Sequence, residues 1–534
     1  MEQKILKILN NKQAVLFCGA GISLDPPAGL PDWHKLRDYT LEAIASLDSH
    51  LQGKISILLE MEMIADSDKK GLTPEVVASE IANHSEGYFD SFASLNDGEP
   101  NANHYLAAAS GFRYIFTTNF DTFIEQALQS KSVTFKVYCT EEDFDTFNDD
   151  ENMVHLFKLH GCISKPKSIT ATVEQEAKGL CYSKRNVLRL LLQECYFLFW
   201  GYSGADFKID IDYLQMLSVS EQAKGFFWDF YDEKVNSYVA QIAEIYGEKA
   251  TISVGNIPKI LSQVSKVEIQ EYTEQERDDW QQQKNATLCA ALEEWSKRYL
   301  QPQQACNMLG RLFLHSGKYL DALCCFERSF VLCKSLPAVE KIEALLNMGI
   351  VHRYCESYDE ALHYFEKAKY ITLQNNLFKE TCHCLNNSGV VYGTRQEYDK
   401  ALACFEEAKK IAVDNNYLKE EAANLNNIGA VCSKQQRYEQ ALNCYERAKK
   451  IAYDIGDKRS FAARLNNIAY VYVQRNEANK ALENYREYEQ VSRSLGDFEG
   501  LSTAYYNMAM LYTSLNKWNE AKKYNDLYQK CKKM

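Results

Sequence analysis

The chain has 534 residues, more than one hydrophobic core usually serves, so we expect two or three domains. Hydrophobic residues make up 46% and charged residues 25%, a globular composition that excludes wholesale disorder. The formal net charge of -13 argues against nonspecific nucleic-acid binding, which would need clustered Lys and Arg.

The N-terminal segment and the cysteines indicate the compartment. MEQKILKILNNKQ lacks the long apolar segment and small-residue cleavage site of a secretory signal. No run of about eighteen or more apolar residues occurs, so we expect no membrane partner. The 17 cysteines include no Cys-x-x-Cys pair, the usual spacing of a four-thiolate zinc site. We therefore expect a reduced, cytoplasmic protein without a bound metal.

Short apolar runs in the first half of the chain alternate with helix-like polar segments. The runs lie at residues 14–18, 114–119, 155–161, 196–201 and 225–231. This alternation is typical of a parallel sheet with crossover helices. We expect residues 1–270 to form a Rossmann-like α/β domain. The acidic stretch 140–152 is expected to be a solvated loop, with a gate over a ligand pocket as the alternative.

Small and polar residues lie at or just after the ends of four of these runs. Ligands of open parallel sheets bind outside the carboxyl ends of the strands, so these residues are candidates for a site. The segments are Gly19-Ala20-Gly21-Ile22-Ser23, Thr117-Thr118-Asn119-Phe120-Asp121, Leu159-His160-Gly161 and Gly201-Tyr202-Ser203-Gly204-Ala205-Asp206. The first glycines can admit the phosphates of a dinucleotide or simply form a turn. The Asn and Asp can also cap a helix, and the histidine can be an ordinary core residue.

The second half of the chain repeats itself. A first unit, YLDALCCFERS, begins at residue 319, and related segments begin at 358, 398, 438, 478 and 518. Each segment and the block upstream of it carry apolar residues at the helical period. Because one helical pair cannot bury its apolar face alone, we expect an all-α solenoid of about six hairpins over residues 304–534. The charged segment 271–303 is expected to be a helical connector.

One position in these units is asparagine five times in succession. The residues are Asn347, Asn387, Asn427, Asn467 and Asn507. An amide both donates and accepts hydrogen bonds, so such a row can bind the backbone of an extended peptide. Alternatively, each asparagine bridges neighbouring helices in the stack or is inherited by repeat duplication.

The motifs of both halves resemble known families. GAGIS (19–23), GLPDW (29–33), TTNFD (117–121), LHG (159–161) and GYS (201–203) resemble the successive signatures of the sirtuin (SIR2) superfamily. This resemblance covers roughly residues 1–270. The second half resembles the tetratricopeptide repeat in its longer variant of about forty residues.

The SIR2 resemblance implies that the residues at the strand ends bind NAD+. Gly19, Ala20, Gly21 and Ser23 would hold the pyrophosphate, Asp32 and Trp33 would border the nicotinamide pocket, and Thr118 would line the site. Gly201 and Ser203 would contact the adenosine half, with Asp206 beside them. Asn119 and Asp121 would position the nicotinamide ribose, and His160 would be the general base.

The chain departs from sirtuin deacylases in two respects. The zinc ribbon of paired Cys-x-x-Cys motifs after the His-Gly is missing, and the interval from Asn119 to His160 is longer than usual. The chain looks more like bacterial SIR2-domain proteins that hydrolyse NAD+ to ADP-ribose and nicotinamide in antiviral defence. The resemblance implies NAD+ as substrate, no metal, a homo-oligomer, and a repeat array that binds a protein or peptide trigger, such as a phage product.

Two other functions stay open. One is a NAD-dependent protein deacylase or ADP-ribosyltransferase on the same fold. The other is a non-catalytic scaffold, in which the SIR2 fold is vestigial and the repeats bind partners.

Overall fold

The computed structural model describes residues 1–534 except 32, 61–71, 97, 173–174, 176–178, 209–211, 232–233, 271, 496 and 534. The chain divides into two compact units. One comprises Met1–Ser46 and Thr73–Leu300, and the other comprises Leu47–Leu72 and Gln301–Met534. The functional boundaries expected at residues 270 and 303 stay predictions.

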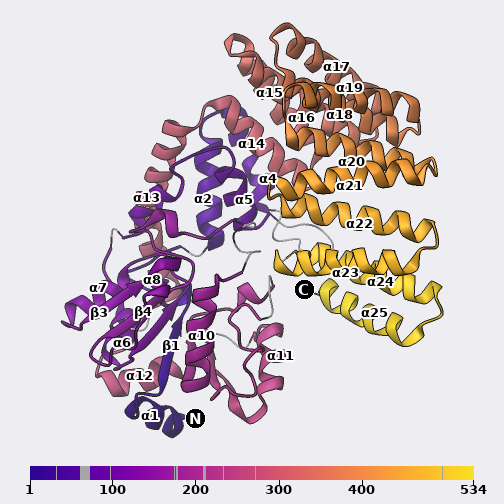
Figure 1. The fold of residues 1–534 in the computed structure, drawn as a ribbon. Coiled ribbons are helices and arrows are strands. Elements are labelled where there is room, and N and C mark those ends of the chain that lie inside the picture. The colour runs from indigo at the N-terminus through magenta and orange to yellow at the C-terminus, as the bar shows by residue number, and fades with distance from the viewer. Residues whose placement is uncertain are drawn as a thin grey trace. The chain divides into compact units, whose positions relative to one another are not determined.

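Within the described residues, a parallel sheet of seven strands forms the centre of the first unit (Figure 1). Its strands are β1 (Ala14–Cys18), β2 (Tyr114–Thr117), β3 (Phe135–Tyr138), β4 (Val154–Lys158), β5 (Tyr196–Trp200), β6 (Phe226–Phe230) and β7 (Ala250–Val254). Their order is β3-β4-β2-β1-β5-β6-β7, and neighbours pair in parallel. The strand order reverses at β1, where open α/β sheets bind ligands.

Two of these strands, β3 and β7, have no counterpart among the apolar runs of the sequence. Both lie at the edges of the sheet. β3 has a single buried residue, Tyr138, and β7 has none. An edge strand pairs on one side only and needs no continuous apolar run, so neither strand gave a signal.

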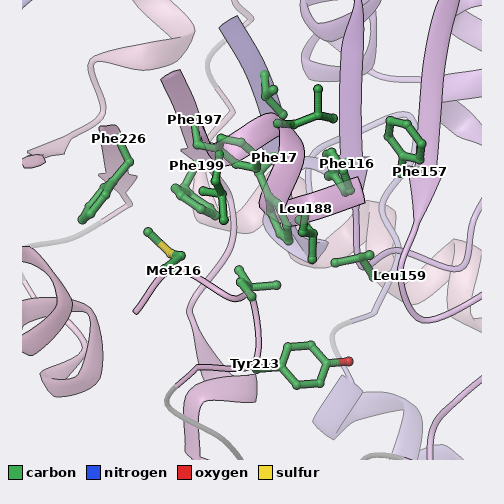
Figure 2. Close-up of a cluster of buried hydrophobic side chains, with 14 of the residues drawn as sticks. Phe17, Phe116, Phe157, Leu159, Leu188, Phe197, Phe199, Tyr213, Met216 and Phe226 are labelled. Atoms are coloured by element: carbon green, nitrogen blue, oxygen red, sulfur yellow. The ribbon is translucent and has the colours of Figure 1, made fainter. Parts of the chain in front are cut away.

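Two hydrophobic clusters cover the two faces of the sheet. Val15 and Phe17 of β1 belong to one cluster, whereas Leu16 and Cys18 belong to the other, because successive strand side chains point to opposite faces. Figure 2 shows the aromatic cluster, whose members from five neighbouring strands include Phe17, Phe116, Phe157, Phe197, Phe199 and Phe226. These rings fix the positions of the strand ends.

Helices cover both faces of the sheet. In the first unit they are α1 (Glu2–Asn10), α2 (Trp33–Ala45), α5 (Pro74–Ala82), α6 (Ala102–Ala109), α7 (Phe123–Ser130), α8 (Glu141–Asp145), α10 (Tyr182–Glu194), α11 (Ser237–Tyr246), α12 (Ile257–Ser265) and α13 (Glu274–Tyr299). Short 3-10 turns include η1 (Ala20–Ser23), η3 (Phe89–Asn96) and η5 (Ala205–Lys208). Residues of α1, α6, α7 and α12 enter one cluster, and residues of α10 and α11 enter the other.

The helix α13 lies within the segment 271–303, whose role as a connector stays a prediction. It packs on α2 and η3 of the same unit. Trp280 Nε1 donates to the main-chain oxygen of Pro27 at 3.0 Å, and Arg277 Nε lies 2.7 Å from Asp25 Oδ1. The helix is therefore an integral part of the first unit.

The acidic stretch 140–152 is not the plain loop that was expected, because it begins with α8. Thr140 Oγ1 accepts the N–H of Asp143, whose carboxylate accepts the N–H of Thr140. Lys165 Nζ also lies 3.1 Å from Asp143 Oδ2. Acidic residues are common both in the first turn of a helix and in solvated loops. Here the capping pair of Thr140 and Asp143 favours the helix.

Six helical hairpins form most of the second unit, within the described residues. Their helices are α14 (Pro302–His315), α15 (Tyr319–Leu332), α16 (Ala338–Tyr354), α17 (Tyr358–Gln374), α18 (Phe378–Thr394), α19 (Tyr398–Asp414), α20 (Leu418–Lys434), α21 (Tyr438–Asp454), α22 (Lys458–Gln474), α23 (Ala478–Ser494), α24 (Phe498–Ser514) and α25 (Trp518–Lys533). A Cβ built on Gly349 would lie 2.4 Å from Phe365, so the two helices approach closely at the glycine. The predicted combination of a Rossmann-like sheet and an all-α solenoid is confirmed.

Candidate functional site

A cavity of about 750 Å³ lies at the carboxyl ends of the central strands. Its lining includes eleven residues selected from the sequence: Ala20, Gly21, Ser23, Trp33, Thr118, Asn119, Asp121, His160, Gly201, Ser203 and Asp206. Gly19 is not part of the lining, and Asp32 lies outside the described residues. The volume falls within the roughly 300–1,000 Å³ typical of small-molecule sites. The fold therefore gathers segments far apart in the chain around one cavity.

The glycines of the first loop let two backbone segments approach each other. The N–H of Gly19 donates to Trp200 O at 3.1 Å, and the N–H of Gly21 donates to Gly201 O at 3.0 Å. A Cβ on Gly19 would lie 2.4 Å from Gly201 O, which is too close for any side chain. Gly19 thus joins η1 to the loop after β5, and the proposed phosphate contact falls to Ala20, Gly21 and Ser23.

Two asparagines that no motif marks in the sequence support this glycine-rich loop. Asn101 Nδ2 donates to the main-chain oxygens of Ile22 at 2.8 Å and Asp25 at 2.9 Å. Asn103 Nδ2 donates to Asp25 Oδ2 at 3.2 Å. Asn101 also forms a capping box with His104 at the start of α6, a pattern that marks the start of a helix and not a binding site.

Ser23 Oγ is the centre of a buried hydrogen-bond network. It accepts from Asn119 Nδ2 at 3.0 Å and donates to Asp121 Oδ2 at 3.1 Å. It also lies 3.0 Å from His104 Nε2. Because His104 Nδ1 accepts the N–H of Asn101, the proton of the neutral ring is on Nε2, which donates to Ser23. The serine hydroxyl therefore orients Asn119 and Asp121 together.

Burial keeps His104 uncharged. The ring is fully buried, and burial lowers the pKa of His104 to about 4, although the nearby Asp121 carboxylate acts in the opposite direction. At neutral pH the ring is therefore a neutral donor with a fixed orientation.

Asp121 combines a structural contact with a place in the cavity. Its Oδ1 accepts the N–H of Phe123 at 3.0 Å, at the first residue of α7. Its main-chain oxygen accepts from the buried Lys158 Nζ, which also lies 2.8 Å from Glu125 Oε1. One carboxylate oxygen thus serves the helix and the other serves Ser23. The part of Asp121 in positioning a ribose stays a prediction.

Asn119 lines the cavity and carries an acceptor without a hydrogen-bond partner among the described residues. This acceptor is Oδ1, and the residue is 7% exposed. Because Nδ2 is fixed by Ser23, the direction of Oδ1 is fixed as well. A buried carbonyl oxygen without a partner is unfavourable unless a ligand or water meets it. The cavity is therefore suited to a ligand with a donor or a positive charge here.

His160 reaches the cavity from the end of β4. Its Nε2 lies 3.1 Å from Tyr213 Oη and 3.4 Å from Asp206 Oδ1, and the hydroxyl of Tyr202 donates to Asp206 Oδ2. Burial lowers the pKa of His160, and the Asp206 carboxylate opposes this shift. The ring is neutral at pH 7 and can accept a proton. No motif of the sequence pointed to Tyr213. Asp206, which was expected near the adenosine, lies beside this imidazole.

Trp33 forms an apolar wall of the cavity at the start of α2. Its Nε1 donates to Glu75 Oε1 at 2.8 Å. Its ring packs edge-on against Phe92 and Phe120, with centroids 6.1 and 5.6 Å away. Such a wall suits a flat aromatic ligand.

The end of β6 and residues beyond it also line the cavity, although the sequence analysis singled out no site residue there. Tyr231 donates its hydroxyl proton to Gly21 O at 2.7 Å. A Cβ on Gly21 would lie 2.4 Å from the ring of Tyr231. Asp229 is less available to a ligand, because its carboxylate accepts the N–H groups of Asn256 and Ile257 at the start of α12.

The asparagines of the repeats make hydrogen bonds inside the array. The Nδ2 atoms of Asn427, Asn467 and Asn507 donate to the Oδ1 atoms of Asn386, Asn426 and Asn466 in the preceding units, at 2.6, 2.9 and 2.9 Å. Asn387 donates to His383 O in its own helix. Asn347 Nδ2 has no partner in the described part of the chain. Three of the five residues thus bridge repeats, and peptide binding stays a prediction.

Across the described ranges, no group of three or more His, Cys, Asp or Glu side chains could hold a metal ion. Among the helices of the same residues, none has the length and apolar character needed to cross a membrane.

Comparison with known proteins identifies a domain family in each half of the chain. The model of the SIR2-like domain family matches residues 113–249, a range that holds Asn119, Asp121 and His160 but not the glycine-rich loop. The tetratricopeptide repeat model matches residues 340–412, 380–454 and 420–494. No curated protein matches the sequence.

Several solved structures resemble part of the chain. BtubC from P. vanneervenii is 14% identical, with a TM-score of 0.36, over 40% of this chain and 88% of its own. The apo form of RapI is 14% identical, with a TM-score of 0.34, over 43% and 97%. The Rap conjugation regulator of plasmid pLS20 is 15% identical, with a TM-score of 0.37, over 52% and 80%. By its two family matches, the chain carries a SIR2-like domain joined to an array of tetratricopeptide repeats.

Proposed function

We propose that the cavity at the strand ends binds NAD+ as a substrate and hydrolyses it to ADP-ribose and nicotinamide. One observation carries this proposal: Asn119, with its unpaired acceptor, and His160, with its neutral imidazole, line the same cavity. The match to the SIR2-like family, whose domains use NAD+, supports the choice of ligand.

The chemistry of the bond suits these residues. When the nicotinamide–ribose bond breaks, its electron pair stays on the nicotinamide nitrogen and positive charge develops on the sugar. Fixed carbonyl and carboxylate groups in a water-poor cavity stabilise such charge. Asn119 Oδ1 would face this charge, and Asp121 would keep the Ser23 network in place.

His160 would then act as the general base. A water oxygen bonds to the sugar carbon, and the imidazole takes the proton that this water loses, a contribution of about 10²–10⁴-fold in typical enzymes. The balance is NAD+ plus water to ADP-ribose, nicotinamide and a proton. Ala20, Gly21 and Ser23 would face the pyrophosphate, with Gly201 and Ser203 toward the adenosine.

For the repeats we propose that they bind a protein or peptide trigger, and that a homo-oligomeric enzyme depletes NAD+ in antiviral defence, for example against phages. An unregulated NADase would empty its own cell, so the resting protein would be inactive until the trigger binds. A repeat solenoid offers the extended concave surface that such a partner needs.

Nicotinamide release and cellular NAD+ test the activity. Purified wild type is mixed with NAD+, and cellular NAD+ is followed during induced expression and phage challenge. Wild type is expected to consume NAD+ in at least one setting, and Asn119→Ala and His160→Ala are expected to lose about 10²-fold or more. His84→Ala, a partly exposed histidine that does not line the cavity, is the matched control and should behave as wild type.

Each other result points to a different function. Release that requires an acylated peptide would identify a deacylase, and transfer of ADP-ribose to protein would identify a transferase. Depletion that persists in both variants would remove Asn119 and His160 from the active site. A folded wild type that consumes no NAD+ in any setting would leave the repeats as the functional part.

A further inference from the structure

We infer that Asp206 and Tyr213 are positioning residues that hold Nε2 of His160 and leave Nδ1 of the ring to accept the proton. The inference rests on the proposed NAD+ hydrolysis and gives Asp206 a role other than adenosine binding.

The contacts of the imidazole differ between its two nitrogens. Nε2 lies 3.1 Å from Tyr213 Oη and 3.4 Å from Asp206 Oδ1. Nδ1 has no hydrogen-bond partner among the residues that the structure describes, and His160 lines the cavity. The protein thus holds the ring by one nitrogen and leaves the other for a substrate.

Asp206 decides which nitrogen carries the proton. Its side chain is nearly buried, and the hydroxyl of Tyr202 fixes its Oδ2, so Oδ1 stays beside the ring. A carboxylate next to Nε2 favours the tautomer with the proton on that atom, because the N–H dipole then points toward negative charge. Nδ1 is then the unprotonated nitrogen. A base oriented by a third group recurs in other hydrolytic sites.

Tyr213 restricts the rotation of the His160 ring, because its own side chain is buried and its hydroxyl contacts Nε2. Tyr213 is 4% exposed and belongs to the aromatic cluster on one face of the sheet (Figure 2). The planes of the tyrosine and imidazole rings are 85° apart, and the tyrosine hydroxyl lies 3.1 Å from Nε2. With the proton on Nε2, the imidazole donates to the tyrosine oxygen.

In this geometry each carboxylate oxygen of Asp206 already has one neighbour in the protein. One carboxylate oxygen accepts from Tyr202 and the other lies beside His160. A ribose hydroxyl would have to compete with these groups. The two roles predict different kinetics, because an adenosine contact acts mainly on substrate binding, whereas an oriented base acts on the chemical step.

Two other charged groups act on the same ring. Lys184, whose Nζ donates to Leu159 O at 2.6 Å, lowers the pKa of His160. Glu75, which accepts from Trp33, raises it. Both remain in place when Asp206 or Tyr213 is changed, so a change in titration can be assigned to the altered residue.

The first test measures kcat and KM for nicotinamide release between pH 5 and 8, under conditions in which wild type is active. Asp206→Asn and Tyr213→Phe are each expected to lower kcat about tenfold or more with KM within about twofold. In Asp206→Asn the acid limb should also move to lower pH, because loss of the negative charge favours the neutral ring. The exposed Asp278→Asn and Tyr182→Phe are the matched controls and should match wild type. A higher KM with an unchanged kcat and acid limb would assign Asp206 to adenosine binding and overturn the inference.

The second test requires no turnover. Nitrogen-15 NMR of labelled histidine reports which ring nitrogen carries the proton, and the His160 signal is assigned by its loss in His160→Gln. Wild type should show the proton on Nε2, and Asp206→Asn should reduce that population. A wild-type ring protonated on Nδ1 would refute the inference. Absence of NAD+ hydrolysis would instead refute the proposed function and leave the NMR result standing.

Discussion

At the scale of residues, the cavity depends on polar groups that are almost completely buried. Ser23, Asn119 and Asp121 are 2%, 7% and 5% exposed. Each has its orientation set by a neighbour in the network rather than by solvent. Such groups are expensive to disturb, because a broken hydrogen bond leaves a buried polar atom without a partner.

Gly19 should tolerate no side chain. In Gly19→Ala the new Cβ would meet Gly201 O and Tyr202 Cα, so the two loops must separate. Strain of this kind typically costs about 1–3 kcal/mol. Gly53→Ala is the matched control, because nothing lies within 4 Å and its φ is -72°. Thermal unfolding of both variants checks this, and equal midpoints would contradict the close approach of the loops.

The neutral state of His104 predicts a pH dependence of stability. Its pKa in the folded protein, about 4, is below the ordinary value of 6.5, so between these values the unfolded chain binds the extra proton. Stability from this group is therefore present above pH 6.5 and falls as the pH drops toward 4, by a few kcal/mol at most. His104→Gln, which keeps an amide donor near Nε2, should lose less stability than wild type between pH 7 and 5 in urea denaturation. Parallel curves would show that His104 is not held neutral.

The sequence predicted the residues of the cavity where chemistry and position coincide in a motif. Asn119, Asp121 and His160 each lie at or just beyond the end of an apolar run, so the strand-end rule found them. Asn101 and Tyr213 act through contacts with residues 79 and 53 positions away, and no local pattern records such pairs.

At the scale of elements, strands with continuous apolar runs were predictable and the others were not. The runs at 14–18 and 196–201 gave β1 and β5, which are buried in the middle of the sheet. β3 and β7 were not predicted, because edge strands are partly exposed and need no continuous apolar run. α8 was not predicted, because the acidic composition of its segment suggested a loop, whereas the capping pair stabilises a helix.

The asparagine contacts between repeats should couple neighbouring hairpins. Asn427 Nδ2 donates to Asn386 Oδ1 at 2.6 Å, one helical pair earlier. A double-mutant cycle with Asn386→Ala and Asn427→Ala should give a coupling of about 0.5–1.5 kcal/mol in urea denaturation. Asn387→Ala is the matched control, because Asn387 bonds within its own helix and should not couple to Asn427. Zero coupling for the first pair would mean that the amides do not bridge the repeats.

At the scale of the whole molecule, the two compact units do not follow the order of the chain. Residues 47–72 precede most of the sheet in the sequence but belong to the unit of the repeats. The segment contains α3 (Ser49–Gln52) and α4 (Ile55–Glu60). It is tied to α15 of the first hairpin by Arg328, whose Nη2 lies 2.8 Å from Asp48 Oδ2. Nothing in the 47–72 segment resembles a repeat, so the sequence assigned it to the sheet domain.

Arg328→Gln should destabilise the unit of the repeats. Burial raises the pKa of Asp48, but the hydrogen bonds from Arg328 and the N–H of His50 outweigh this and lower it. The pair therefore stabilises the fold at neutral pH and stops doing so on acidification through the lowered pKa. Because Arg328 is one-third exposed, we expect a loss of about 1–3 kcal/mol at pH 7.

Arg447→Gln is the control for this change. Its pair with Glu421 spans 3.5 Å with a 57% exposed arginine side chain, so less than about 1 kcal/mol is expected. Urea denaturation at pH 7 measures both variants. Equal losses would show that the segment containing Asp48 does not pack on the first hairpin.

The central claim is that strand ends from distant parts of the chain form one site for NAD+. Calorimetric titration of the purified full chain with ADP-ribose tests it most directly, because binding of the product requires neither a trigger nor turnover. We predict one site per chain in wild type and loss of binding in Gly21→Val, whose side chain would collide with Tyr231 and Gly201 and displace the loop that lines the cavity. A folded wild type that takes up no ADP-ribose at millimolar concentration, or a Gly21→Val that binds it unchanged, would contradict the account.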